Sequence, residues 1–164
     1  MYKKMQVANA SEPRALLEAR RFSGSNTRTN IARDAETWTH PGGRVLLKEK
    51  VLSDVTRKGK IFDIVKAQHP WVEQLTLNKN TMCTRHTDRN EGNSVIAFFG
   101  DFENGGLFIE EPDGLRHVQE KNVWHEYNGR HPHYTEAWTG GDRYSIVAYQ
   151  KKAQSSALST TAEA

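Results

Sequence analysis

Two histidines, an aspartate and an arginine in the C-terminal half have the types and spacing of a metal and anion site. His86-Thr87-Asp88 is followed by His133, and Arg143 comes ten residues after His133. On a strand, residues i and i+2 point to the same face, so His86 and Asp88 can bind one metal ion. Two histidines and a carboxylate form one face of an Fe(II) site and leave positions open for an oxidant and a second ligand.

The third metal ligand has to come from a segment distant from the His-x-Asp pair. The later histidines that can supply it are His117, His125, His131 and His133. Residues 127–133 have the composition of a turn leading into a strand, which favours His131 and His133. Pro132 interrupts the alternation between these two, so periodicity leaves both open. A zinc site made by both would lack a cysteine or carboxylate partner.

Arg143 precedes an apolar segment, and its side chain should face the same way as that of Ser145, toward the core. A buried guanidinium needs an anionic partner, because burial of an unpaired charge is costly. One candidate partner is the carboxylate of a 2-oxo acid, bound through a bidentate ion pair with Ser145 as an added donor. The other is an acidic side chain of the protein itself.

The elements that position these residues follow from periodicity and turn signals. Residues 11–21 have a capping serine, an early proline and good helix formers, which predict a helix. Residues 58–68 have an apolar helical pattern that ends before His69-Pro70. Residues 22–30 have a loop composition, and residues 45–47 fit either a short strand or the start of a helix.

From Trp71 onward the chain consists of short β-like segments separated by turns. The predicted strands are 72–78, 82–87, 94–99, 107–109, 122–127, 133–138 and 144–150. Residues 101–106 and 111–114 are predicted turns. Strands at this spacing, with helices confined to the N-terminal half, predict a mainly β fold, namely an antiparallel sandwich or jelly roll with flanking N-terminal helices.

Length and composition indicate one domain. A chain of 164 residues can bury a sizeable core. We expect residues 1–150 to form this domain, with helical support from about 1–70, a jelly-roll core over about 71–150 and a disordered tail over 151–164. No apolar run is long enough to span a membrane, and the start lacks the core of a signal peptide. The single cysteine, Cys83, fits a reducing compartment, so we expect an intracellular protein, cytoplasmic or, in a eukaryote, nuclear.

The net charge of +3 is unevenly distributed. Residues 1–80 hold 15 Lys/Arg against 8 Asp/Glu, whereas residues 81–164 hold 8 against 12. A basic half suits a polyanionic partner such as nucleic acid, and the alternative is a solvated surface without a partner. Candidate phosphate contacts and base-stacking residues are Arg20, Arg21, Arg28, Arg33, Lys58, Lys60, Trp38 and Trp71.

Taken together, these residues resemble the Fe(II)/2-oxoglutarate-dependent dioxygenases, which share a double-stranded β-helix, a distorted jelly roll. The family pattern is His-x-Asp, a distal histidine, an arginine at a fixed interval after it and often a serine two residues further. The resemblance maps this pattern onto His86, Asp88, His133, Arg143 and Ser145. The ten-residue interval to Arg143 selects His133 over His131.

The resemblance implies the cofactors and the reaction. Fe(II) would be bound by His86, Asp88 and His133, and 2-oxoglutarate by Arg143 and Ser145 with help from Asn78. O2 would then be used to hydroxylate a substrate C–H bond, with succinate and carbon dioxide as the other products. The carboxylate of Asp88 argues against the related halogenases, which lack it. One algal relative uses ascorbate in place of 2-oxoglutarate, and the presence of Arg143 favours 2-oxoglutarate.

Residues 71–150 are most similar to the branch that contains the TET and J-binding-protein (JBP) oxygenases and their small viral, algal and protist relatives. The matching segments are Leu75-Thr-Leu-Asn-Lys-Asn80, Gly100-Asp-Phe-Glu-Asn-Gly-Gly-Leu107 and Arg143-Tyr-Ser-Ile-Val147. This likeness implies oxidation of the methyl group of 5-methylcytosine or thymine in nucleic acid, with DNA favoured over RNA.

Three residues near the metal motif are candidates for contact with such a substrate. Arg85 and Arg89 flank the motif, and Asn80 could hydrogen-bond a base, although an asparagine there could equally complete a turn. Two other functions remain open. One is the same chemistry on a small metabolite or a protein side chain, and the other is a non-catalytic metal-binding module with this fold.

Overall fold

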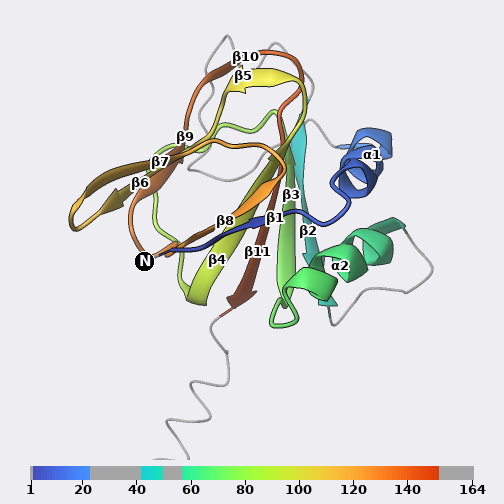
Figure 1. Ribbon diagram of the computed structural model, residues 1–164, viewed down its shortest axis with the longest axis horizontal. Helices are drawn as coiled ribbons and strands as arrows, with labels where there is room; N and C mark the ends of the chain where they lie inside the picture. The colour runs from blue at the N-terminus through green and yellow to red at the C-terminus, as the bar shows by residue number, and fades with distance from the viewer. Residues whose placement is uncertain (1, 23–41, 50–56, 152–164) are drawn as a thin grey trace, which may run out of the picture.

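A computed structural model describes residues 2–22, 42–49 and 57–151, with side chains from residue 60 onward in the last range (Figure 1). The elements in chain order are β1 (Lys4–Gln6), α1 (Ser11–Ala19), β2 (Gly43–Lys48), α2 (Arg57–Gln68), β3 (Gln74–Lys79), β4 (Asn90–Phe99), β5 (Phe102–Asn104), β6 (Leu107–Glu111), β7 (Gly114–Val118), β8 (Val123–Tyr127), β9 (His133–Thr135), β10 (Trp138–Gly140) and β11 (Tyr144–Lys151). None of the helices in this part of the chain has the length and apolar character needed to cross a membrane.

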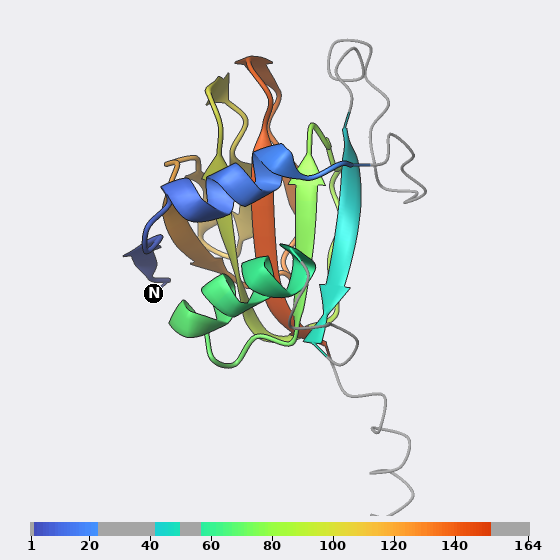
Figure 2. The same ribbon diagram turned by 90° about the vertical axis from the view of Figure 1, so that its right-hand side faces the viewer.

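The strands form one large and two small antiparallel sheets. The large sheet has the order β1-β8-β4-β11-β3-β2, and the small sheets have the orders β7-β6-β9 and β10-β5. Helices α1 and α2 cover one face of the large sheet (Figure 2), and the small sheets lie on its other side (Figure 1). The predicted class, mainly β with flanking N-terminal helices, is therefore confirmed.

Strand β11 shows how the sequence divides the large sheet into two faces. Tyr144, Ile146 and Ala148 pack in the core between this sheet and the helices, together with Ile61 and Phe62 of α2. The alternate residues of β11 point to the opposite face, because side chains of a strand alternate with a period of two. Burial of each large apolar side chain in this core contributes about 1.5–3 kcal/mol relative to exposure.

A second apolar cluster fills the space between the large and small sheets. It contains Phe98 of β4, Phe102 of β5, Ile109 of β6 and Trp138 of β10. This cluster fixes the small sheets over one end of the large sheet. The cavity described below lies on the same inner face.

The structure differs from the sequence-based expectation in several segments of the C-terminal half, and β7 was not predicted. Residues 82–87 do not form a strand; they contribute an isolated pairing between His86 and His133. Residues 133–138 divide into β9 and β10, because β9 pairs with β6 and β10 pairs with β5. The predicted turn at 101–106 contains the short strand β5 before Asn104 and Gly105 turn the chain with φ values of 64° and 75°.

The N-terminal half contributes strands as well as helices. Residues 45–47 belong to β2, and β1 and β2 form the two ends of the large sheet, so the segment expected to give helical support is also part of the sheet. Ser11 does not cap α1; Ala10 occupies the cap position, and the Ser11 hydroxyl bonds to the Asn9 side chain. Of the predicted loop at 22–30 and the predicted tail at 151–164, only Phe22 and Lys151 are described, and Lys151 ends β11 and so does not belong to a tail. The rest of both segments lies outside the described residues, as do Arg33, Trp38 and the side chain of Lys58. Arg28 lies in the part of the loop that is not described.

Candidate active site

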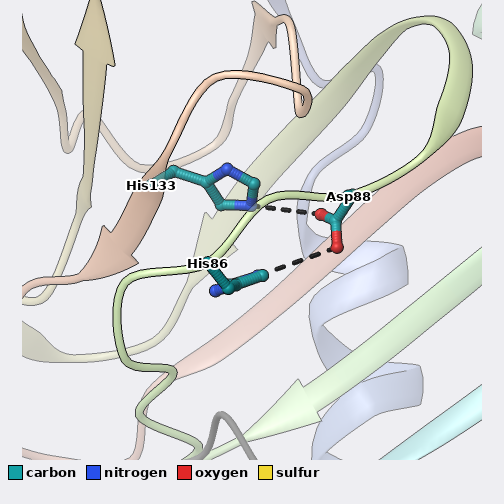
Figure 3. A group of neighbouring side chains, drawn as sticks. All are labelled: His86, Asp88 and His133. Carbon is teal, nitrogen blue, oxygen red and sulfur yellow. Dashed lines mark hydrogen bonds and ion pairs between the residues drawn. The ribbon is translucent and has the colours of Figure 1, made fainter.

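The structure brings His86, Asp88 and His133 together on the inner side of the large sheet (Figure 3). One potential ligand atom from each residue lies within 4.8 Å of the other two. His133 Nε2 is 3.1 Å from Asp88 Oδ2, and His86 Nε2 is 3.8 Å from Asp88 Oδ1. His86 and Asp88 come from the segment before β4, and His133 begins β9. These three groups can bind one metal ion with little rearrangement.

Hydrogen bonds to the backbone orient both histidine rings. His86 Nδ1 lies 2.6 Å from the Thr84 carbonyl oxygen, and His133 Nδ1 lies 2.8 Å from that of His131. A carbonyl oxygen only accepts, so each Nδ1 carries a proton, and Nε2 is the atom that each ring would offer to a metal ion. Metal-binding histidines commonly have such a partner on the other ring nitrogen. The donor set therefore fits a divalent transition metal.

The backbone around the three residues is paired across the two segments. His86 and His133 exchange N–H···O bonds of 3.0 and 2.9 Å, and the Asp88 amide donates to the Gly129 carbonyl at 2.8 Å. These bonds fix the segment before β4 against the start of β9. His131 contributes its carbonyl oxygen to the site, while its ring is not part of the group.

Arg143 is buried in the same region, with 2% of its surface exposed. Its guanidinium lies over the rings of Phe98 and Trp138, 5.3 and 5.4 Å from their centroids, and its Nε donates to the Gly105 carbonyl. Burial lowers the pKa of Arg143 to about 10, so the group remains charged at neutral pH. Among the described residues no carboxylate forms an ion pair with it, so an acidic side chain of the described chain does not fill this role.

Polar groups of β3 and β11 continue the site beyond Arg143. Asn78 Nδ2 donates to Ser145 Oγ at 3.2 Å, and Asn78 Oδ1 is buried without a hydrogen-bond partner in the described chain. Thr76 and Tyr149 share a hydrogen bond of 3.1 Å between their hydroxyl groups. A bound ligand can therefore find an acceptor at Asn78 and hydroxyl groups on both neighbouring strands.

All of these groups line one cavity of about 350 Å³. Of the predicted site residues, the cavity lining includes His86, Asp88, His133, Arg143, Ser145 and Asn78. The cavity opens across the inner face of β11, β3 and β2. A volume of this size is typical of a small-molecule site.

The three predicted substrate contacts lie outside this lining. Asn80 is 1% exposed and has a φ of 49°; its Oδ1 accepts from the Arg143 backbone amide at 2.8 Å, and its Nδ2 donates to Asp142 at 2.9 Å. Asn80 therefore positions the segment that leads into Arg143. Arg85 binds Glu110 through both carboxylate oxygens, and Arg89 is exposed.

The cavity lining also includes basic side chains that the sequence pattern did not single out. Arg44 and Lys48 of β2 and Lys151 of β11 belong to its lining. The available signal was the alternation over residues 44–48, in which Val45 and Leu47 pack toward the helices while Arg44, Leu46 and Lys48 face the cavity.

The cations and tryptophan predicted to contact nucleic acid lie elsewhere. Arg20, Arg21 and Lys60 belong to or follow the helices, which cover the face opposite the cavity (Figure 2). Trp71 is partly buried against the core on the helix side, 5.5 Å from the His69 ring. None of these residues lines the cavity.

Comparison with protein-family models and with curated protein sequences gives no match. Among solved structures, the chain is similar to a prolyl hydroxylase from Trichoplax adhaerens in complex with a hypoxia inducible factor peptide fragment, with a TM-score of 0.63, 12% identity and coverage of 96% of this chain and 86% of that one. For a Pseudomonas putida prolyl-4-hydroxylase the TM-score is 0.58 and the sequence identity is 14%, and the match covers 93% of both chains. For an oxidoreductase of the 2OG-Fe(II) oxygenase family from Burkholderia pseudomallei the TM-score is 0.52 and the sequence identity is 11%. The match covers 88% of this chain and 92% of that one. The predicted jelly roll is thereby confirmed, and the chain has the fold of these oxygenase structures.

Proposed function

We propose that the protein is an Fe(II)- and 2-oxoglutarate-dependent dioxygenase that hydroxylates a C–H bond of its substrate. The observation that carries this proposal is the presence, in one cavity, of the His86, Asp88 and His133 ligand atoms and the buried Arg143. Two histidines and one carboxylate suit Fe(II). A buried guanidinium without a carboxylate partner among the described residues fits a dicarboxylate co-substrate.

Some residues of the chain would bind the metal and the co-substrate, and others would orient the metal ligands. His86, Asp88 and His133 would hold the metal, and Arg143 with Ser145 and Asn78 would bind the carboxylate of 2-oxoglutarate remote from it. When bound, Fe(II), 2-oxoglutarate and O2 supply the oxidation, which yields succinate, carbon dioxide and a hydroxylated substrate. The backbone bonds to both histidines keep the metal-binding nitrogens directed at Asp88.

Succinate formation tests this proposal. We expect the protein loaded with Fe(II), 2-oxoglutarate and air to form succinate, and His86→Ala, Asp88→Ala and Arg143→Ala to abolish it. His117→Ala is the matched control, because the exposed His117 does not line the cavity. Full activity in Asp88→Ala would refute the ligand assignment, and metal binding without succinate formation in the wild type would favour a non-catalytic module.

For the substrate, we infer the methyl group of 5-methylcytosine or thymine in nucleic acid, with DNA favoured over RNA. The support is the sequence likeness of residues 71–150 to the TET and JBP branch. Mass spectrometry of 5-methylcytosine- and thymine-containing DNA and RNA, after incubation with the loaded enzyme, measures the expected oxidised bases. Absence of any oxidised base, together with active succinate formation, would contradict this assignment.

A small metabolite or a protein side chain is the second candidate substrate. The similar structure from Trichoplax adhaerens contains a bound peptide fragment, so a chain of this fold is able to bind a peptide at its surface. Stimulation of succinate formation by peptides, and not by nucleic acid, would favour this candidate.

A further inference from the structure

The charged side chains that line the cavity differ in their surroundings. Asp88 is the sole carboxylate among the described lining residues, and it faces the two histidines. Arg143 lies at the buried end. The remaining charged side chains, Arg44 and Lys48 of β2 and Lys151 at the end of β11, are all cationic; both lysines are exposed, and Arg44 is partly buried.

The register of the large sheet places these cations along one margin of the cavity. Arg44 is opposite Asn78, which is opposite Ser145, so Arg44 is two strands away from Ser145. Lys48 is opposite Gln74, which is opposite Tyr149, and Lys151 follows two residues later. Arg44 and Lys48 are four residues apart on one strand, or about 13 Å at roughly 3.3 Å per residue.

An apolar side chain lies between the two cations of β2. Leu46 points to the same face and is 47% exposed, unlike Leu47 on the other face, which is 2% exposed. Side chains of a strand stand roughly perpendicular to the sheet, so Arg44 and Lys48 present their charges at separate points with Leu46 between them. One small anion would meet one of these charges; a chain of anionic groups with apolar parts between them would meet the whole row.

Some cations elsewhere on the described surface form ion pairs with carboxylates. Arg14 pairs with Glu18 and Asp101, and Arg85 pairs with Glu110. Lys48 and Lys151, in contrast, are exposed and form no ion pair with any carboxylate of the described residues. Their charge is therefore available to a ligand that enters the cavity.

We propose that Arg44, Leu46, Lys48 and Lys151 form a cationic strip that binds the phosphate backbone of a single-stranded nucleic acid whose base enters the cavity. This assignment rests on the proposed function and names the class of its substrate. Phosphates would contact the three cations, and Leu46 would contact the apolar face of a sugar or base. A base has to leave a duplex before it can enter a cavity between two sheets, and a single strand presents its bases without that cost of unpairing.

The experiment is a salt titration of oligonucleotide binding by the metal- and 2-oxoglutarate-loaded protein. Fluorescence anisotropy of a labelled single-stranded oligonucleotide gives the slope of log K against log salt, which becomes shallower by about 0.7 for each phosphate that a variant no longer neutralises. We expect Lys48→Ala/Lys151→Ala to reduce the slope by about 1.4 and Arg44→Ala by about 0.7. Both lysines are exposed, so the double variant should fold normally.

The matched control removes the same charge from the helix face. Arg21→Ala/Lys60→Ala should leave the slope unchanged, because these exposed cations do not line the cavity. Equal slopes for the strip and control variants would overturn the proposal, as would equal binding of an oligoglutamate peptide of the same charge. Succinate formation without nucleic acid is measured in parallel: its absence in the wild type would refute the oxygenase assignment, whereas its presence with unaltered slopes would refute the strip alone.

Discussion

At the residue scale, a backbone carbonyl decides which nitrogen each histidine of the candidate site presents. His86 and His133 both donate Nδ1–H to the carbonyl two residues earlier, at Thr84 and His131. His131, the alternative third ligand from the sequence, therefore enters the site through its backbone and not through its ring. Replacement of its side chain leaves that carbonyl in place.

We accordingly expect His131→Ala to bind Fe(II) or Co(II) with nearly wild-type affinity and His133→Ala to lose at least a factor of about 100, since changes to partners beyond the ligands already cost about 10–100-fold. Metal titration followed by tryptophan fluorescence or calorimetry compares the two variants directly. Equal losses in both would mean that the His131 ring is a ligand.

Replacement of Arg143 should weaken 2-oxoglutarate binding without lowering the stability of the ligand-free protein. Its guanidinium is buried without a carboxylate partner in the described chain, so Arg143→Met should leave the ligand-free protein no less stable, because buried charges are often replaced by apolar groups at no cost. The same change should weaken 2-oxoglutarate binding by about 2–5 kcal/mol, the range for loss of one partner of a buried charge pair. Thermal unfolding with and without 2-oxoglutarate measures both effects.

At the element scale, one face of β11 packs in the helix-side core and the other face lines the cavity. Ile146 is fully buried against the helix-side core, while Val147 packs at the edge of the inner cluster and lines the cavity. Because the two residues are adjacent on one strand, substituting each in turn compares how much the two faces contribute to the free energy of unfolding.

Ile146→Ala should lower the free energy of unfolding by about 2–5 kcal/mol, the range for large-to-small changes in a packed core. Val147→Ala, at a partly buried position, should cost less than about 1.5 kcal/mol. Urea denaturation with an unchanged m-value measures both. A larger loss in Val147→Ala would mean that the inner cluster, and not the helix-side core, dominates the stability of β11.

At the scale of the whole molecule, two buried histidines outside the candidate metal site should make the fold sensitive to acid. His69 is 5% exposed and packs edge-on against the Trp124 ring at 4.8 Å, and His125 is 2% exposed on β8. Burial lowers the pKa of both below the ordinary value of 6.5. The unfolded chain therefore takes up protons near pH 6.5 that the folded protein does not.

The stability at neutral pH should therefore decline as the pH falls below about 6.5, by at most about 1.4 kcal/mol per pH unit for each histidine, until the lowered pKa is reached. His69→Phe/His125→Phe should flatten the dependence of Tm on pH in this window. The exposed His117→Phe is the control and should leave it unchanged. A wild-type Tm that is constant between pH 7 and pH 5 would contradict this prediction.

The sequence by itself determined the features that depend on a few neighbouring residues. The alternation around Ser145 and Ile146 predicted that Arg143 and Ser145 share one face of β11 while Ile146 lies on the other, and the apolar pattern of residues 58–68 predicted α2. The alternation did not predict that the Ile146 face is the one that packs in the helix-side core. Such patterns are local, since strand and helix periods relate residues within one or two turns or pleats. The residue types of the candidate metal site were also readable, because Fe(II) restricts the ligands that suit it.

Only the tertiary structure decided which distant groups meet. It brought His133 and not the His131 ring to His86 and Asp88, gave residues 82–87 isolated bridges in place of a strand, and placed Arg44 and Lys48 at the cavity while α1 and α2 lie behind the sheet. These outcomes depend on which strands pair and which faces are buried. Sheet pairing joins residues far apart in the chain, so a pattern within one segment does not contain that information.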